Sequence, residues 1–132
     1  MFKIFFSVIL FCSILQYTIA ESNSSEFTLI QPPKQYVDKF RVFVDETKAL
    51  QSVICFKGSQ TQIHELCGYT QGFITYGCFI TPDHIYMSED YVTRCDTWVH
   101  EFLHAYLFNT IGNAYQHHEH IFFSQINDIC SE

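Results

Sequence analysis

The sequence predicts a small α+β domain in which an antiparallel or mixed sheet packs against one long helix. Residues 98–108, WVHEFLHAYLF, are apolar around most of a helical turn and predict the long helix. Residues 73–80 and 84–88 are rich in β-branched and aromatic side chains and flank the turn signal Thr81-Pro82-Asp83, which predicts a hairpin. The chain has 132 residues, which allows one domain at most.

Residues 1–20, MFKIFFSVILFCSILQYTIA, have the pattern of a secretory signal peptide. A basic residue precedes a short apolar run, and a small residue, Ala20, stands where cleavage is expected. The run is short for a membrane-spanning helix. We therefore expect a secreted or secretory-lumen protein, with an N-glycosylation acceptor at Asn23 in the mature tail.

The amino-terminal half of the domain starts from a flexible tail, residues 21–33, which is polar and ends in two prolines. The domain then covers 34–132. Apolar spacing predicts a helix over 34–49, although alternation within FRVFV leaves a strand open. Residues 52–56 predict a buried strand, and the glycine-containing stretch 58–72 predicts a loop.

The carboxy-terminal half is predicted to be helical. Asp96 or Thr97 is expected to cap the long helix, which runs to about residue 110 with Gly112 as its stop signal. A short loop and a last helix over about 118–130 complete the order helix, strand, hairpin, long helix, helix.

The charge of the chain argues against some classes of partner. Without the leader, six basic residues face fourteen acidic ones, for a net charge near −8. Such a surface repels nucleic acids and anionic membranes, so neither is expected as a partner.

Five cysteines remain after the leader, with its Cys12, is removed. In an oxidising compartment we expect two bridges and one spare thiol, which leaves a monomer or a disulfide-linked dimer. A Cys78–Cys95 bridge would brace the long helix, and a Cys55–Cys67 bridge would close a short loop. Cys130 then has no obvious partner and could occupy a metal site as an inhibitory thiolate.

The long helix carries the chemical signal H-E-x-x-H at His100, Glu101 and His104. Histidines four residues apart share one helical face, so both imidazoles can bind one zinc ion. Glu101 is rotated by about 100° from His100 and points beside the metal, where a general base is needed. The motif therefore predicts a zinc site with its base.

A catalytic zinc site needs a third protein ligand and one open position. Residue 110 is a threonine, which excludes the metzincin spacing, and the segment QHHEHIFF offers the remaining candidates. A glutamate ligand would usually lie further along its helix than Glu119, which favours the histidines. The residues that stay open on spacing alone are His117, His118 and His120.

The stretch HEFLHAYLFNTIGNAYQHHEHIF resembles the active-site region of the SprT-like metallopeptidases, a branch of the zincins. That family continues, after a variable loop, with a histidine followed by phenylalanine four residues later, and His118 with Phe122 fits this pattern. The resemblance implies a zincin-like fold and the zinc ligands His100, His104 and His118, with Glu101 as the base. Glu119 replaces the usual glycine, and the family's role on DNA-linked proteins does not fit a secreted, acidic chain.

The sequence thus predicts a secreted zinc metallopeptidase acting on proteins or peptides, in which Glu101 takes a proton from a metal-activated water and passes it to the leaving amine. Tyr115, His117 and His120 are candidate donors to the oxyanion, while His64 and His84 are interpreted as ordinary loop and strand residues. The alternative is a non-catalytic zincin-fold binding protein with a structural or sequestered zinc, which four protein ligands would favour.

Overall fold

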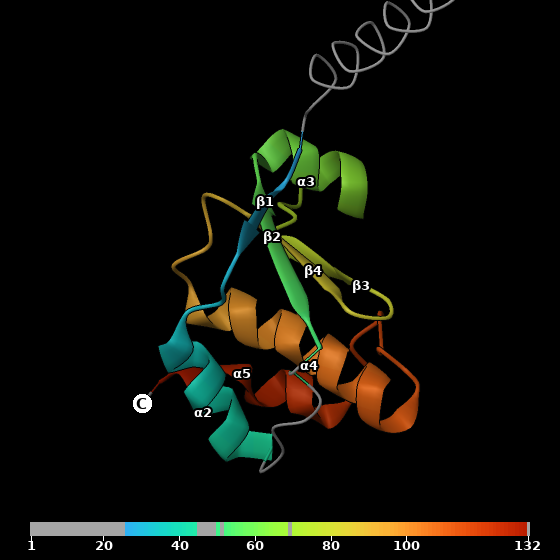
Figure 1. Ribbon diagram of the computed structural model, residues 1–132. Helices are drawn as coiled ribbons and strands as arrows, with labels where there is room; N and C mark the ends of the chain where they lie inside the picture. The colour runs from blue at the N-terminus through green and yellow to red at the C-terminus, as the bar shows by residue number, and fades with distance from the viewer. Residues whose placement is uncertain (1–25, 45–49, 51, 69, 132) are drawn as a thin grey trace, which may run out of the picture.

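The computed structural model describes residues 26–44, 50, 52–68 and 70–131 (Figure 1). It confirms the α+β class. Along the chain the elements are β1 (Thr28–Ile30), α2 (Lys34–Val44), β2 (Ile54–Gly58), α3 (Gln60–Cys67), β3 (Gly77–Ile80), β4 (His84–Ser88), α4 (Cys95–Ile111), the 3₁₀ helix η2 (Ile121–Gln125) and α5 (Ile126–Cys130).

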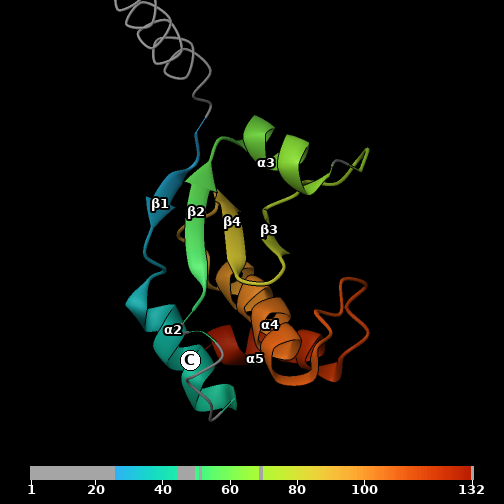
Figure 2. The same cartoon turned by 45° about the vertical axis from the view of Figure 1, so that its right-hand side comes forward.

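The four strands form one mixed sheet in the order β1-β2-β4-β3 (Figure 2). β2 and β4 are parallel, whereas β1 pairs with β2, and β3 with β4, in antiparallel fashion. The helix α3 joins the region of β2 to that of the β3–β4 hairpin. Because β3 is the last strand in this order, it is an edge strand of the sheet. The backbone edge of β3 that does not pair with β4 is left without a strand partner, and β3 packs against α4.

The predicted hairpin is present, but its first strand begins at Gly77 instead of residue 73. The reason lies in Thr75, whose carbonyl accepts a hydrogen bond from the Gln60 side chain at 2.6 Å. A backbone held by α3 in this way does not join the ladder. In β4, Ile85 and Met87 are fully buried, as expected for alternate residues that face the helices.

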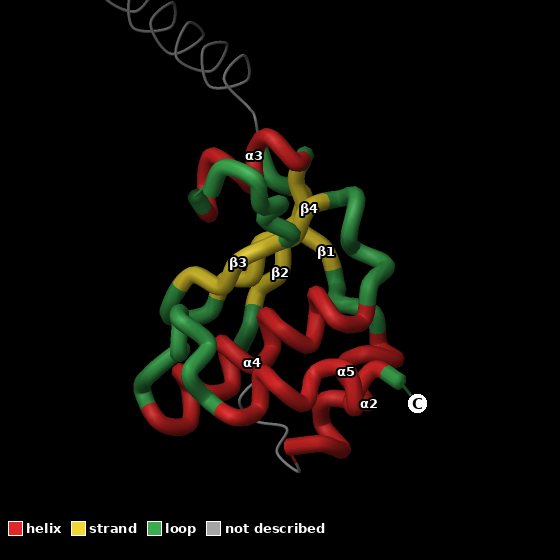
Figure 3. Tube along the Cα trace, turned by 180° about the vertical axis from the view of Figure 1, so that it is seen from behind, coloured by secondary structure: helices red, strands yellow, loops and turns green. Residues whose placement is uncertain are grey.

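The helix α4 lies under the sheet and forms the centre of the core (Figures 1 and 3). It packs against β3, α2 and α5. Trp98, Phe102 and Leu103 are buried, and the Trp98 indole donates to the Val92 carbonyl at 2.8 Å. Burying each of these large side chains contributes about 1.5–3 kcal/mol, so α4 is the element that the core is built on.

The expected start of α4 was wrong, and its expected end is confirmed. The N-cap is Arg94, without a side-chain capping bond, and Asp96 lies within the first turn. The turn Tyr91–Arg94 is closed by a backbone hydrogen bond of 3.1 Å and leads directly into the helix. The helix therefore begins before the first side chain that could cap it, that of Asp96. Gly112 ends the helix with φ 74°, a left-handed conformation that glycine adopts at little cost.

Two amino-terminal predictions were wrong. Residues 28–30, expected within the flexible tail, form the edge strand β1 because Leu29 pairs with Phe56 of β2. Residues 60–67, expected as loop, form α3. A capping box starts that helix: the Ser59 hydroxyl accepts from the Gln62 backbone, and the Gln62 side chain accepts from the Ser59 backbone.

The predicted helix over 118–130 is broken into two shorter pieces. The described chain is irregular until His120, which caps η2 by accepting a hydrogen bond from the Phe122 backbone at 3.2 Å. His118 has φ 62°, which no right-handed helix contains. A loop that contains His118 therefore replaces the first turn of the predicted helix.

The disulfides match the expected number but not the expected pairs. Cys67 bonds Cys78, Cys95 bonds Cys130, and among the described residues Cys55 is the free cysteine. The expected bridges Cys78–Cys95 and Cys55–Cys67 are both wrong. Phe79 of β3 faces the core, so its neighbour Cys78 points to the opposite face of the sheet, away from Cys95.

The cysteine expected to be spare is also different. Cys130 is bridged and cannot be a thiolate ligand of a metal. Cys55 is 3 % exposed, and burial raises the pKa of its thiol to about 12. A thiol that is buried and protonated in the folded domain is a poor candidate for a bond between two chains.

The predicted signal peptide, its cleavage at Ala20 and the acceptor Asn23 lie outside the described residues. Within the described residues, none of the helices combines the length and hydropathy that crossing a membrane requires. The two disulfides are compatible with an extracellular location.

The bridges should differ in their contribution to stability. Cys95–Cys130 spans 35 residues and Cys67–Cys78 spans 11, so loop entropy gives about 4 and about 3 kcal/mol respectively. Replacing Cys95 and Cys130 by alanine should lower the free energy of unfolding more than replacing Cys67 and Cys78. Urea unfolding of the two double variants measures this, and the reverse order would contradict it.

Candidate metal centre

The two histidines of the H-E-x-x-H motif converge as the sequence predicts. His100 and His104 lie one turn apart on α4, and their Nε2 atoms are 3.2 Å apart. Two nitrogens bound to one tetrahedral zinc ion, each at about 2.0–2.1 Å from it, are separated by about 3.3 Å. The spacing of these atoms therefore fits a shared ion.

The fold orients the His104 ring. Its Nδ1 lies 2.6 Å from the Ala114 carbonyl oxygen, which can only accept a hydrogen bond. Nδ1 must therefore carry the proton, and in the neutral ring Nε2 keeps a lone pair directed at His100. The left-handed turn at Gly112 makes this contact possible because it reverses the chain and returns Ala114 to the side of α4.

His118 completes a group of three histidines. Its ring centroid lies 4.6 Å from that of His100 and 5.0 Å from that of His104. One ligand nitrogen from each of the three lies within 4.8 Å of the others, so the group could hold a metal ion. His104 is buried, His100 is half-buried and His118 is exposed, which leaves one side of the group open to solvent.

The aromatic side chain that lies against these rings is Phe123, and not Phe122, which stands four residues after His118 and would share a helical face with it. The Phe123 ring lies 5.4, 4.8 and 5.0 Å from the rings of His100, His104 and His118. Phe122 instead packs on Phe43 at 5.1 Å and on His120 at 4.5 Å. The spacing of four assumed a helix from 118 onward, but the irregular segment before η2 shifts the aromatic contact by one residue.

The His100 and His104 rings are held neutral. The pKa of His100 is lowered to about 3, first by burial and then by repulsion from His104 and His118. Burial also lowers the pKa of His104. Neutral imidazole is the form that binds metals, so both rings are available as ligands near neutral pH.

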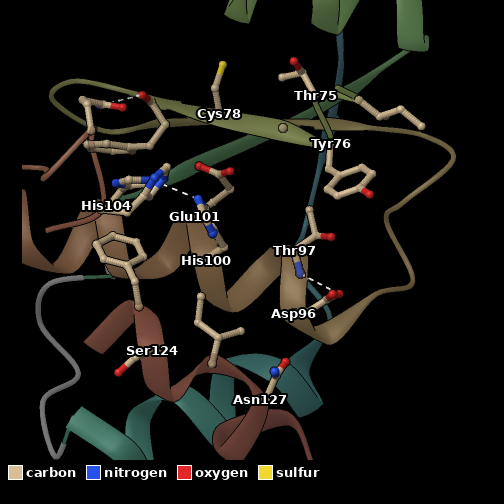
Figure 4. A pocket seen from close by; sticks show the side chains of 17 residues that line it. Thr75, Tyr76, Cys78, Asp96, Thr97, His100, Glu101, His104, Ser124 and Asn127 are labelled. Carbon is tan, nitrogen blue, oxygen red and sulfur yellow. Dashed lines mark hydrogen bonds between the residues drawn. The ribbon is translucent and has the colours of Figure 1, made fainter. Parts of the chain in front are cut away.

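Glu101 lies between α4 and β3, beside the histidines (Figure 4). It is 4 % exposed, and burial raises the pKa of its carboxyl to about 8, while a hydrogen bond from the Phe79 backbone acts in the opposite direction. Its Oε2 atom has no hydrogen-bond partner within the described part of the chain. A buried carboxyl oxygen without a partner is costly, which indicates a position kept for a ligand or a water.

These groups line a cleft of about 530 Å³. Its floor is α4, one wall is the segment from Ile74 to Phe79, and the other wall is formed by η2 and α5 (Figure 4). Side chains from the second wall that line the cleft are Phe123, Ser124, Ile126 and Asn127. The cleft therefore places open space next to the three histidines and Glu101.

The other residues that the sequence singled out lie outside this lining. His117 and Glu119 are exposed, and neither they nor Tyr115 nor His120 is among the cleft residues. The rings of Tyr115 and His120 meet edge-to-face with centroids 5.2 Å apart, so both have a structural contact. Of the candidate ligands in QHHEHIFF, the structure brings only His118 to the motif, within the described residues.

Sequence reasoning missed two parts of the site. The Ala114 carbonyl carries no side-chain signal, although the helix stop at Gly112 marks where the chain turns back. The cleft end near the start of α4 is formed by Tyr76, whose ring lies 4.3 Å from that of Tyr91 and 5.0 Å from the Arg94 guanidinium. No local pattern pairs residues so far apart in the sequence.

His84 lies in the strand β4 as predicted, whereas His64 lies on the helix α3 instead of in a loop. His64, on α3, contacts Gln60 through Nε2 at 2.8 Å, and the Thr75 backbone N–H donates to the same atom at 3.4 Å. The Nδ1 atom of His84 lies 2.9 Å from Oδ1 of Asp83, and the His84 ring stacks on Phe56. Neither is part of the histidine group at the cleft.

Removal of His118 tests the assignment of the third ligand. His118→Ala should lower zinc affinity more than 100-fold, because substitutions of residues that only support a ligand typically cost 10- to 100-fold. His117→Ala, an exposed neighbour, is the matched control and should bind zinc as the unaltered protein does. His120→Ala should lower zinc affinity by at most the 10- to 100-fold that is typical of supporting residues. Titration against a competing chelator measures all three.

The assignment would be lost if His117→Ala or His120→Ala released the ion while His118→Ala retained it.

Comparison of the chain with protein-family models, with curated proteins and with solved structures found no match.

Proposed function

We propose that this chain is a secreted zinc-dependent metallopeptidase. The observation that carries the proposal is the buried, unpartnered Oε2 of Glu101 beside three histidines whose nitrogens lie within 4.8 Å of one another. The donor set fits zinc, since three imidazoles leave the fourth position open, as catalytic zinc sites do. Bound there, Zn²⁺ supplies Lewis acidity, which lowers the pKa of a water and polarises a carbonyl.

The role of Glu101 follows from its environment. An Oε2 atom without a partner can accept a proton, and the raised pKa, about 8, allows the carboxyl to hold that proton near neutral pH and then donate it to a leaving amine. A nearby cation would stabilise the carboxylate and bring its pKa down towards the working range. The hydrogen bond from the Phe79 backbone keeps the carboxyl against β3.

The edge strand β3 favours a peptide as substrate. The Tyr76 carbonyl accepts a hydrogen bond from the Ser88 backbone at 2.8 Å, so Tyr76 points its backbone at β4. In an antiparallel pair this direction alternates, which turns the backbone of Gly77 outward. Gly77 lines the cleft, where its N–H and C=O can pair with an extended peptide.

A metal ion with a structural role is the second candidate. The hydrogen bond between Glu101 and the Phe79 backbone favours it, because the carboxyl then has a purely structural partner. Against it stands the composition of the site: in the described residues, the metal-binding group consists of three histidines, whereas structural zinc sites use four protein ligands. The likeness of the motif region to SprT-like metallopeptidases also favours peptide hydrolysis.

Glu101→Gln distinguishes these candidates. The amide keeps the shape of the side chain but cannot take up the proton, so peptide cleavage should fall by 10²-fold or more while zinc content stays at one ion per chain. The assay is cleavage of casein and of a peptide library, with and without chelator, alongside metal analysis. His117→Ala serves as the active control. Equal turnover of the Gln variant and the unaltered protein would reject the catalytic role.

The burial of Glu101 also predicts how the stability of the metal-free protein depends on pH. The folded-state pKa of about 8 exceeds the ordinary 4.5, so the unfolded chain ionises first and stability falls as pH rises from about 4.5 to about 8. The lowered pKa of His100, about 3 instead of 6.5, acts in the opposite direction, but only below pH 6.5. Between pH 6.5 and 8 the contribution of Glu101 remains.

In that window, urea unfolding in chelator should show the free energy of unfolding falling by up to about 1.4 kcal/mol per pH unit. Glu101→Gln should remove this slope because glutamine does not titrate. Parallel slopes in the two proteins would show that the Glu101 carboxyl is already ionised in the folded state.

A further inference from the structure

An exposed apolar lip borders the cleft. It consists of Phe73, Ile74 and Tyr76, which are 72 %, 55 % and 37 % exposed and lie between α3 and β3. Ile74 and Tyr76 line the cleft itself, so the lip is continuous with the space beside the histidines. Single exposed apolar side chains are common on protein surfaces, but three within four positions at the mouth of a cleft indicate a binding surface.

The backbone of the lip is fixed at Thr75. Its carbonyl accepts from the Gln60 side chain at 2.6 Å, its hydroxyl donates to the Gly68 carbonyl at 3.0 Å, and its N–H donates to His64 Nε2 at 3.4 Å. The buried Ser88 hydroxyl in turn donates to Gln60 Oε1 at 2.7 Å. Since Thr75 points its polar groups at α3, the residues on either side of it are presented outward.

Two further contacts hold the ends of the lip. The Cys67–Cys78 disulfide ties the end of α3 to β3 and closes the segment into a loop. The Tyr76 ring is held by Tyr91 at 4.3 Å and by the Arg94 guanidinium at 5.0 Å. A surface ordered before binding loses little conformational entropy when a ligand arrives, which favours affinity.

The charged side chains near the lip are paired with each other, which disfavours a charged ligand at the lip. Asp96, which also lines the cleft, is paired with Arg94, whose Nε lies 3.0 Å from its Oδ1. The pairing lowers the pKa of Asp96 and cancels its charge towards a ligand. On the opposite wall the half-buried Phe123 and Ile126 add apolar surface. The remaining chemistry that fits the lip is an apolar side chain.

We infer that the lip sets the substrate class of the cleft, and that it selects extended peptide segments carrying a bulky apolar side chain such as phenylalanine or leucine. This inference rests on the proposed function, because it takes the cleft to bind peptides. It adds that Phe73 and Ile74 receive the selected side chain, while Tyr76 bounds the surface towards the start of α4.

The test measures binding separately from cleavage. Zinc-loaded Glu101→Gln protein is titrated with dye-labelled heptapeptides of sequence Gly-Ser-Gly-X-Gly-Ser-Gly, in which X is phenylalanine, leucine, serine, aspartate or lysine, and anisotropy is recorded. The lip variant carries Phe73→Ser and Ile74→Ser in the same background. The matched control carries Ile111→Ser and Ile121→Ser, which remove side chains that are 56 % and 67 % exposed and lie outside the cleft lining.

Phenylalanine and leucine peptides should bind about 10-fold more tightly than the serine peptide, the scale for a modest apolar contact. The lip variant should lose this preference and the control should retain it. No binding, equal binding of all peptides, or a preference that survives in the lip variant would overturn the inference, as would an equal loss in the control.

Cleavage by the protein with intact Glu101 separates the two proposals. Selective binding in the Gln background without cleavage by the intact protein rejects the peptidase and supports the lip. Cleavage without preference for apolar residues, mapped by mass spectrometry of the products, supports the peptidase and rejects the lip.

Discussion

The rest of the structure depends on one constraint: α4 is buried along most of its length, and its buried residues include the ionisable side chains of Glu101 and His104. A buried polar group without a partner costs about 1–3 kcal/mol, so these side chains must be satisfied. The turn at Gly112 returns the Ala114 carbonyl to His104, and β3 lies close enough for its Phe79 backbone to reach Glu101. Oε2 of Glu101 is left without a partner, and the lone pair of His104 Nε2 is directed at His100; all three residues line the same cleft.

Two disulfide bridges hold the walls of the cleft in place. The Cys67–Cys78 bridge ties α3 to β3, and the Cys95–Cys130 bridge ties the start of α4 to the end of α5. The first bridge thus fixes the β3 wall relative to α3, and the second fixes the α5 wall relative to α4, the helix that carries His100 and His104. A site built on rigid elements holds its candidate ligand atoms in place before any ligand binds.

The electrostatics of the cleft have two different origins. Burial keeps His100 neutral, which suits metal binding, and burial keeps the Glu101 carboxyl protonated up to about pH 8, which a bound cation would oppose. Asp96 instead remains ionised beside Arg94. The groups of the cleft with shifted pKa values are thus neutral, as for His100 and Glu101, or paired, as for Asp96, which is consistent with the inferred selection of apolar side chains at Phe73 and Ile74.

The local parts of the site could be predicted from the sequence. The spacing of His100, Glu101 and His104 on one helix, the helix stop at Gly112 and the pairing of β3 with β4 depend on residues a few positions apart, and helical and strand periods determine them. The α+β class followed from the same patterns. The capping box of Ser59 and Gln62 is equally local, and it marks the start of α3 in the sequence despite the glycines on either side.

Tertiary packing alone decided the remainder. Cys78 pairs with Cys67 because the alternation of β3 turns it away from α4, and Phe123 displaces Phe122 at the histidines because an irregular segment precedes η2. Residues 28–30 become a strand only because β2 offers them an edge. Each outcome depends on which face of one element meets another across a long stretch of chain, and a sequence period specifies the faces of an element but not the partner that covers them.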